Sequence, residues 1–92
     1  PTLRQALRRL AKLGIVQVLI EGGSHTLGAA FDQKLVDEVC WYLAPDFLGG
    51  PIPATGGKGT GDPQKSITLR NPEYKKIGPD LRIRGLCCYD QV

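Results

Sequence analysis

The run IVQVLI at residues 15–20 constrains the fold more than any other segment of the chain. It is short, almost wholly apolar and rich in β-branched residues, which is typical of a strand that is buried on both faces. Gly14 precedes the run, and the sequence Glu-Gly-Gly at 21–23 follows it and breaks the pattern. We therefore predict a buried strand at residues 15–20 with a turn directly after it.

A helix is expected on each side of this strand. Thr2 and Gln5 have the spacing of a capping box, and a helix of about three turns then extends to Gly14, with apolar and basic residues on opposite faces. Residues 24–33 predict a second helix. Its buried side is expected to carry Leu27, Ala30 and Phe31.

The third predicted element, residues 37–44 (DEVCWYLA), is a second strand, which Pro45 ends. A strand, a helix and a strand in succession form a βαβ unit, and such units are almost always right-handed. The fold class indicated so far is α/β.

The rest of the chain predicts a long loop and a hairpin. Residues 47–63 are rich in glycine and proline, and the run GGKGTG at 56–61 lacks the spacing and the Lys-Ser/Thr ending of a P-loop. Residues 66–89 alternate apolar and polar side chains around the turn Gly-Pro-Asp at 78–80. An antiparallel hairpin is therefore expected at the C-terminal end of a single domain over residues 1–92.

Charge and cysteine content favour some function classes over others. The net charge is +3, and the one basic stripe, on the first helix, has no aromatic residues interleaved with it, so we expect a solvated face and no nucleic-acid partner. Cys40, Cys87 and Cys88 form no Cys-x-x-Cys pair with a histidine, which favours a reduced, cytoplasmic compartment and no bound metal. No run approaches the roughly 20 apolar residues of a membrane helix, so no membrane partner is expected.

The strongest chemical signal is the turn at residues 21–23, followed by Ser24, His25 and Thr26 at a helix start. Free backbone N–H groups and the positive end of a helix dipole meet there, which suits a phosphate or pyrophosphate. The turn is not a G-x-G-x-x-G fingerprint, because its third position is Ser24. A plain connection between a strand and a helix explains the same residues, so both interpretations stay open at this point.

Several linked motifs resemble one known family. They are VLIEGGSHTLGAAF at 18–31, LVDE at 35–38, YLAP at 42–45, LGG at 48–50 and IGPDLRI at 77–83. In this order they resemble the reductase domain of the bifunctional riboflavin-biosynthesis deaminase/reductase. The resemblance implies a dihydrofolate-reductase-like three-layer fold, in which NADPH reduces the ribose of 5-amino-6-(5-phosphoribosylamino)uracil, a phosphoribosylaminopyrimidine, to the ribityl chain.

The same resemblance implies site residues. By position, Glu21 corresponds to a carboxylate that contacts the substrate, while no catalytic residue can be assigned. The family's deaminase domain, with its zinc-binding His and Cys-x-x-Cys, has no counterpart in the sequence, so zinc is not expected. The segment that wraps the cofactor phosphates corresponds to Gly23, Ser24, His25, Thr26, Leu27, Gly28 and Ala29.

The resemblance is to the C-terminal half of that reductase domain alone. We therefore expect a reductase fragment that keeps part of the NADPH site and lacks turnover by itself. A non-catalytic interaction domain is the alternative, because exposed sheet edges recruit a second copy or a missing half. A third possibility is a homo-oligomer in which two copies form one small reductase.

Overall fold

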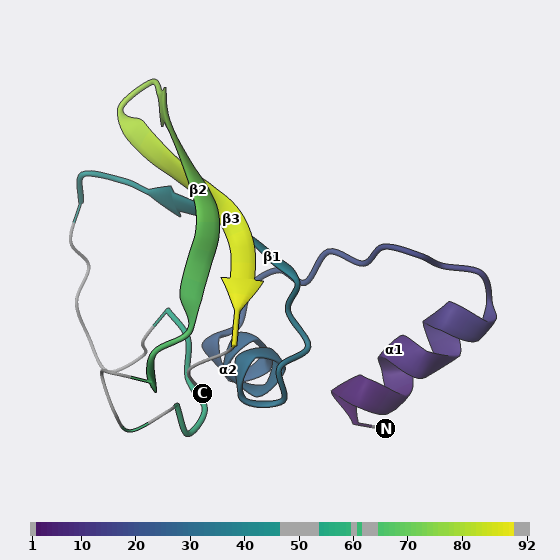
Figure 1. Cartoon of the computed structure of the whole chain (residues 1–92). Helices are drawn as coiled ribbons and strands as arrows, with labels where there is room; N and C mark the ends of the chain where they lie inside the picture. Colours follow the sequence, from purple (N-terminus) through teal and green to yellow (C-terminus); the bar gives the residue numbers. More distant parts are fainter. Residues whose placement is uncertain (1, 47–53, 60, 62–64, 90–92) are drawn as a thin grey trace. The chain divides into compact units, whose positions relative to one another are not determined.

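A computed structural model describes residues 2–46, 54–59, 61 and 65–89 (Figure 1). The chain divides into two compact units, one made of Pro1–Leu35 with Ile52–Gly59 and the other of Val36–Pro51 with Thr60–Val92. Each unit is described by itself. No helix in the described part of the chain has the length and the apolar character of a membrane span.

The first unit begins with helix α1, Leu3–Lys12. The Thr2 hydroxyl accepts a hydrogen bond from the Gln5 N–H at 3.1 Å, and the Gln5 side chain accepts one from the Thr2 N–H at 2.9 Å. This reciprocal pair satisfies two amide groups that the first turn of a helix leaves without partners. The capping box predicted from the sequence is thus confirmed, as is the helix.

Helix α2, Ser24–Asp32, is the second element of this unit and ends one residue earlier than predicted. Its apolar side carries Ala30, which is fully buried, with Leu27 and Phe31 half-buried. A residue with left-handed backbone, Lys34, follows the helix at φ 57°. The helix predicted after the two glycines is therefore confirmed together with its buried side.

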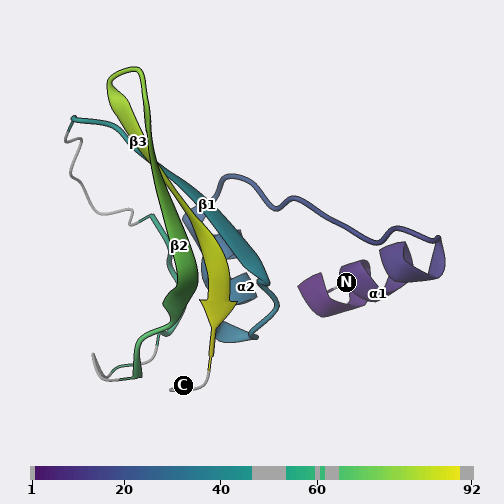
Figure 2. The same cartoon turned by 45° about the horizontal axis from the view of Figure 1, so that its top comes forward.

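The prediction of a buried strand at residues 15–20 was wrong. The segment forms no strand in the structure, and the two views draw it as plain chain between α1 and α2 (Figures 1 and 2). Val16 is 98% exposed and Leu19 is 78% exposed. A strand needs a neighbour to pair its N–H and C=O groups, and no described segment pairs with this one. The predicted βαβ unit is consequently not formed either, because it loses its first strand.

The second unit contains a three-stranded antiparallel sheet in the order β1-β3-β2 (Figure 2). The strands are β1 (Glu38–Leu43), β2 (Thr68–Ile77) and β3 (Asp80–Cys88). The second predicted strand and the C-terminal hairpin are confirmed. Most of the loop predicted at 47–63 lies outside the described residues.

The hairpin turn has two residues, because Ile77 pairs directly with Asp80. Gly78 has φ 56°, in the left-handed region that glycine adopts at no steric cost, and the ring of Pro79 requires a negative φ. A positive φ followed by a negative one is the pattern of a type II′ turn, whose twist matches that of the flanking strands. The sequence Gly-Pro therefore fixes both the turn type and the register.

A β-bulge interrupts β2 where Asn71 and Pro72 together lie opposite Gly85 of β3. Asn71 takes a positive φ of 53°, and Pro72 has no N–H to donate to a ladder. Proline is tolerated here because β2 is an edge strand of the described sheet. The bulge keeps the side chains on both sides of it in phase with those of β3.

The register gives the sheet one apolar and one charged face. Trp41, Ile83 and Tyr74 form a row across the three strands, since Ile83 pairs with both of the others. Side chains of directly paired residues lie on the same face. The same face also carries Val39, Leu43, Leu69, Leu81 and Cys87, with one charged residue, Lys76, opposite Leu81 near the hairpin turn, while Glu38, Glu73, Arg82 and Arg84 belong to the other face.

Candidate functional site

The turn before α2 has left-handed backbone at two successive glycines. Gly22 and Gly23 have φ values of 67° and 54°, a region that side-chain-bearing residues rarely adopt. The first intrahelical hydrogen bond of α2 runs from the Leu27 N–H to the Gly23 carbonyl oxygen at 3.1 Å. The N–H groups of residues 24–26 thus precede the helical ladder and lie at the positive end of the helix dipole.

The described residues neither cap nor block this helix end. Gly23 has no side chain that could cap the helix, and the first turn contains no acidic residue that would repel an anion. A Cβ built on Gly22 would meet nothing within 4 Å, and one on Gly23 would meet only the Thr26 hydroxyl, at 3.8 Å. The open backbone and the lack of an acidic side chain therefore suit an anion such as a phosphate group.

The predicted site residues on either side of Gly22 and Gly23 differ in their exposure to solvent. Glu21, His25 and Thr26 are exposed, while Ser24 is half-buried. A ligand at the helix end could therefore reach the backbone of the turn together with these polar side chains. The arrangement can bind and orient an anionic ligand.

Gly28, by contrast, is buried beneath other backbone. A Cβ on Gly28 would lie 2.3 Å from the carbonyl carbon of Gly56 and 2.5 Å from the amide nitrogen of Gly57. Its neighbours Leu27 and Ala29 are half-buried. The predicted cofactor segment is thus divided into an open first turn and a second turn that the chain itself covers. Direct contact between Gly28 and a cofactor stays a prediction.

The covering segment, residues 54–59, is called the glycine loop below. Its amides are engaged within the first unit: the Gly56 N–H donates to the Ser24 carbonyl oxygen at 2.8 Å. The amides of Lys58 and Gly59 donate to the two carboxylate oxygens of Asp32, at 2.7 and 3.0 Å. Because these N–H groups are engaged, the described part of the sequence GGKGTG at 56–61 is not an open phosphate cradle. Its residue spacing, which differs from that of a P-loop, agrees with this result.

Asp32 was not singled out from the sequence. Its partners are 26 and 27 residues away in the chain, so no local pattern reveals them. The one available signal is weak: a carboxylate at the last residue of a helix lies at the negative end of the dipole, and α2 has no basic residue in its last turn to compensate. Such a locally unfavourable position indicates a partner elsewhere in the fold.

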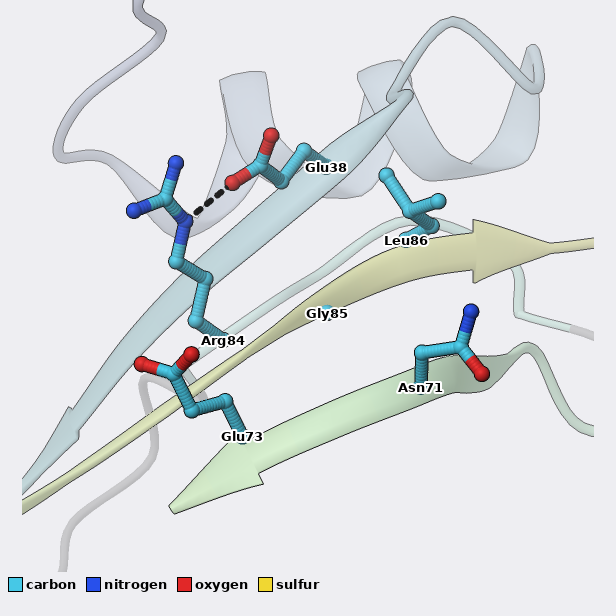
Figure 3. A pocket seen from close by; sticks show the side chains of 6 residues that line it. All are labelled: Glu38, Asn71, Glu73, Arg84, Gly85 and Leu86. Atoms are coloured by element: carbon cyan, nitrogen blue, oxygen red, sulfur yellow. Dashed lines mark hydrogen bonds and ion pairs between the residues drawn. The ribbon is translucent and has the colours of Figure 1, made fainter. Parts of the chain in front are cut away.

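A shallow pocket lies on the charged face of the sheet, beside the bulge (Figure 3). Arg84 pairs with Glu38 across β3 and β1, and Arg82 pairs with Glu73 at 2.9 Å. The hydrogen bond with Glu38, and secondly its charge, raise the pKa of the Arg84 guanidinium above its ordinary value. Within each of these two pairs one acid balances one base, and exposed ion pairs of this kind contribute little stability.

A family model described as the RibD C-terminal domain matches residues 2–83, which is most of the chain. The chain belongs to this family. The resemblance drawn from the sequence motifs is confirmed, and the match extends over α1, α2, β1 and β2 and into β3. It includes the uncapped turn before α2 and the whole glycine loop.

Similar RibD proteins occur in distant bacteria. The riboflavin biosynthesis protein RibD of Aquifex aeolicus is 27% identical over 81 residues, which are 88% of this chain and 22% of that protein. RibD of Mycobacterium tuberculosis H37Rv is 33% identical over 64 residues, 70% of this chain and 19% of the relative. RibD of Chlamydia trachomatis is 47% identical over 47 residues, which are 51% of this chain and 12% of that protein. The chain thus spans about a fifth of the length of the first of these relatives.

In the second unit of this RibD-family chain, Val36 and Asp37 are hydrogen-bonded to Tyr89 and Cys87, and these four residues are called the clamp below. The Tyr89 hydroxyl donates to the Val36 carbonyl oxygen at 2.7 Å and accepts from the Val36 N–H at 3.1 Å. The Cys87 N–H donates to the Asp37 carbonyl oxygen at 2.8 Å, which continues the pairing of β1 with β3. Together these contacts tie the two residues before β1 to the end of β3 and to the residue after it.

The clamp does not contain a reactive nucleophile. Burial is the main cause that raises the pKa of the Cys87 thiol, and the interaction with Tyr89 partly opposes it, so the thiol stays neutral at pH 7. Burial is also the main cause that raises the pKa of Tyr89 to about 12. The three cysteines are unbridged, and the described residues contain no cluster of His, Cys, Asp and Glu that could hold a metal ion.

Proposed function

We propose that this chain is the C-terminal half of a riboflavin-biosynthesis reductase domain and that its residues 21–29 form part of the NADPH and substrate site. Family membership supports the reductase assignment. The observation that carries the cofactor assignment is the uncapped N-terminus of α2, which follows two glycines with positive φ and has no acidic residue in its first turn. A dinucleotide pyrophosphate is the anion that suits such a helix end in a reductase.

The residues of the turn then have distinct roles. The N–H groups of Ser24, His25 and Thr26 donate to the pyrophosphate, and the hydroxyls of Ser24 and Thr26 add further donors. Gly23 allows the phosphates to approach the backbone, and Glu21 orients the substrate. NADPH, when bound, supplies the hydride that reduces the ribose. Leu27, Gly28 and Ala29 remain assigned to the cofactor by the family resemblance alone.

The complete domain has a dihydrofolate-reductase-like three-layer fold in this proposal, and both units of the chain belong to it. The substrate is 5-amino-6-(5-phosphoribosylamino)uracil. Since positioning the sugar beside the nicotinamide needs both halves of the site, the chain alone binds NADPH without turnover.

Calorimetric titration with NADPH tests the cofactor site. The Gly23→Asp variant places a negative charge beside the pyrophosphate, and we expect its affinity to fall by about tenfold or more. Gly78→Asp is the matched control, because Gly78 has nearly the same φ, 56° against 54°, and similarly open surroundings, but lies in the hairpin turn. Equal affinities of the two variants, or a parent chain without measurable NADPH binding, would contradict the proposal.

A second candidate function is a non-catalytic interaction domain that associates with another copy. The observation that favours it is the apolar segment at residues 15–20, which offers β-branched side chains without charge or proline to any unpaired strand edge.

Light scattering after size exclusion tests this candidate. We expect the parent chain to associate and a Val16→Lys, Leu19→Lys double variant to be monomeric, because two charges in this segment oppose pairing with a strand edge. Leu13→Lys is the control, since Leu13 is also exposed, at 77%, but lies outside the segment. A parent chain that is strictly monomeric at high concentration would exclude the candidate.

A further inference from the structure

We infer that Asp32 is a positioning residue for the proposed cofactor site and that it acts by fixing the glycine loop along α2. The inference rests on the proposed function, because it concerns the same helix N-terminus. Asp32 is the last residue of α2 and cannot touch a ligand at the first turn. Its influence must therefore pass through the loop.

The first step is the contact at the end of the helix. Both carboxylate oxygens of Asp32 accept backbone N–H groups, from Lys58 at 2.7 Å and from Gly59 at 3.0 Å. Hydrogen bonds to an ionised acceptor are stronger than neutral ones. A carboxylate at a helix C-terminus is otherwise unfavourable, so the loop amides compensate a charge that the helix dipole opposes.

The second step is the close packing of the glycine loop against α2 between Ser24 and Asp32. A Cβ on Gly57 would lie 2.4 Å from an oxygen of Asp32 and 3.0 Å from the carbonyl carbon of Gly28. Ser24, Gly28 and Asp32 are four residues apart and share one side of the helix. Glycine in the loop and glycine in the helix thus allow the two backbones to lie in contact along that side.

The third step reaches the proposed site. The Gly56 N–H donates to the Ser24 carbonyl oxygen at 2.8 Å. A Cβ on Gly56 would lie 3.4 Å from the Ser24 hydroxyl oxygen, so the loop also borders that side chain. Ser24 contributes an amide and a hydroxyl to the proposed pyrophosphate site. The glycine loop therefore borders the first turn of α2 at Ser24, and the hydrogen bonds to Asp32 fix the position of the loop.

The test compares the parent chain with Asp32→Asn, which keeps the size of the side chain but can accept at one oxygen only. Amide hydrogen exchange reports on the loop, and calorimetric titration with NADPH reports on the site. Asp46→Asn removes the same charge from an exposed residue of the other unit. Thr2→Ala removes the α1 cap and so weakens the first unit without touching the loop.

We expect exchange of the Lys58 and Gly59 amides to accelerate about tenfold in Asp32→Asn, because a hydrogen bond to a charged group is lost. The Gly56 amide should follow, and the NADPH dissociation constant should rise about fivefold as the site loses preorganisation. Asp46→Asn and Thr2→Ala should keep the dissociation constant of the parent.

Three outcomes overturn the inference and leave the proposed function intact: unchanged exchange in Asp32→Asn, faster exchange with unchanged NADPH affinity, or an equal loss of affinity in Thr2→Ala. A parent chain that does not bind NADPH overturns the proposed function, and the role of Asp32 toward the cofactor falls with it.

Discussion

Replacing Gly28 by alanine is expected to destabilise the chain by about 2 kcal/mol, although the same change stabilises most helices. Alanine in a helix interior is favoured over glycine by about 0.5–1 kcal/mol, since its backbone loses less entropy on folding. At this position the new methyl group would lie 2.3 Å from the carbonyl carbon of Gly56. Forcing extra atoms into close packing costs about 1–3 kcal/mol or more, so the steric term outweighs the helix propensity.

The sign of the change in unfolding free energy, measured in urea, decides this prediction. Ala29→Gly is a useful comparison, because it removes a methyl group from the adjacent position of the same helix and reports the propensity term. A Gly28→Ala variant that is more stable than the parent would mean that the glycine loop does not contact α2 in solution.

Replacing Tyr89 by phenylalanine should lower the stability of the second unit by about 1–2 kcal/mol at pH 7. The phenol both donates to and accepts from the backbone of Val36, and its loss leaves two part-buried polar groups without their partner. Urea unfolding monitored by tryptophan fluorescence measures the difference, since Trp41 lies in β1 of the same unit.

The advantage of the parent over Tyr89→Phe should disappear in alkali. The folded chain raises the pKa of Tyr89 to about 12, while the pKa in the unfolded chain is about 10. Because the folded state favours the protonated phenol, the stabilisation is fully present below pH 10 and is lost as the pH rises toward 12. Partial exposure of the phenol to water limits this contribution to about 2 kcal/mol.

A difference between parent and variant that stays constant from pH 7 to pH 11 would contradict this account. The comparison with Tyr89→Phe is essential, because every other ionisable group is present in both chains. Their contributions cancel in the difference, so the remaining dependence on pH belongs to Tyr89 and to the Cys87 thiol beside it.

The sequence predicted the elements whose causes are local. Thr2 and Gln5 are three residues apart and specify the start of α1 by bonding to each other. Gly78 and Pro79 allow one narrow combination of backbone angles, which sets the hairpin turn. The turn at Gly22 and Gly23 was located for the same reason, and so was the anion site proposed at the start of α2.

Features that depend on residues far apart in the chain could not be predicted from the sequence. Residues 15–20 have every local property of a buried strand, yet backbone pairing needs a neighbour, and the described chain supplies none, so the segment is exposed. In the same way, the sequence of β1 does not reveal that Trp41 pairs with Ile83, a residue 42 positions further along the chain.

The sequence by itself determined the helices, the antiparallel hairpin, the glycine turn and, through linked motifs, the family. Only the tertiary structure decided that Gly28 is covered by the glycine loop rather than open to a ligand, and that Asp32 fixes this loop. The physical reason is range: caps and turns are set by hydrogen bonds within a few residues, whereas a contact across 26 residues forms only when the folded chain brings its two ends together.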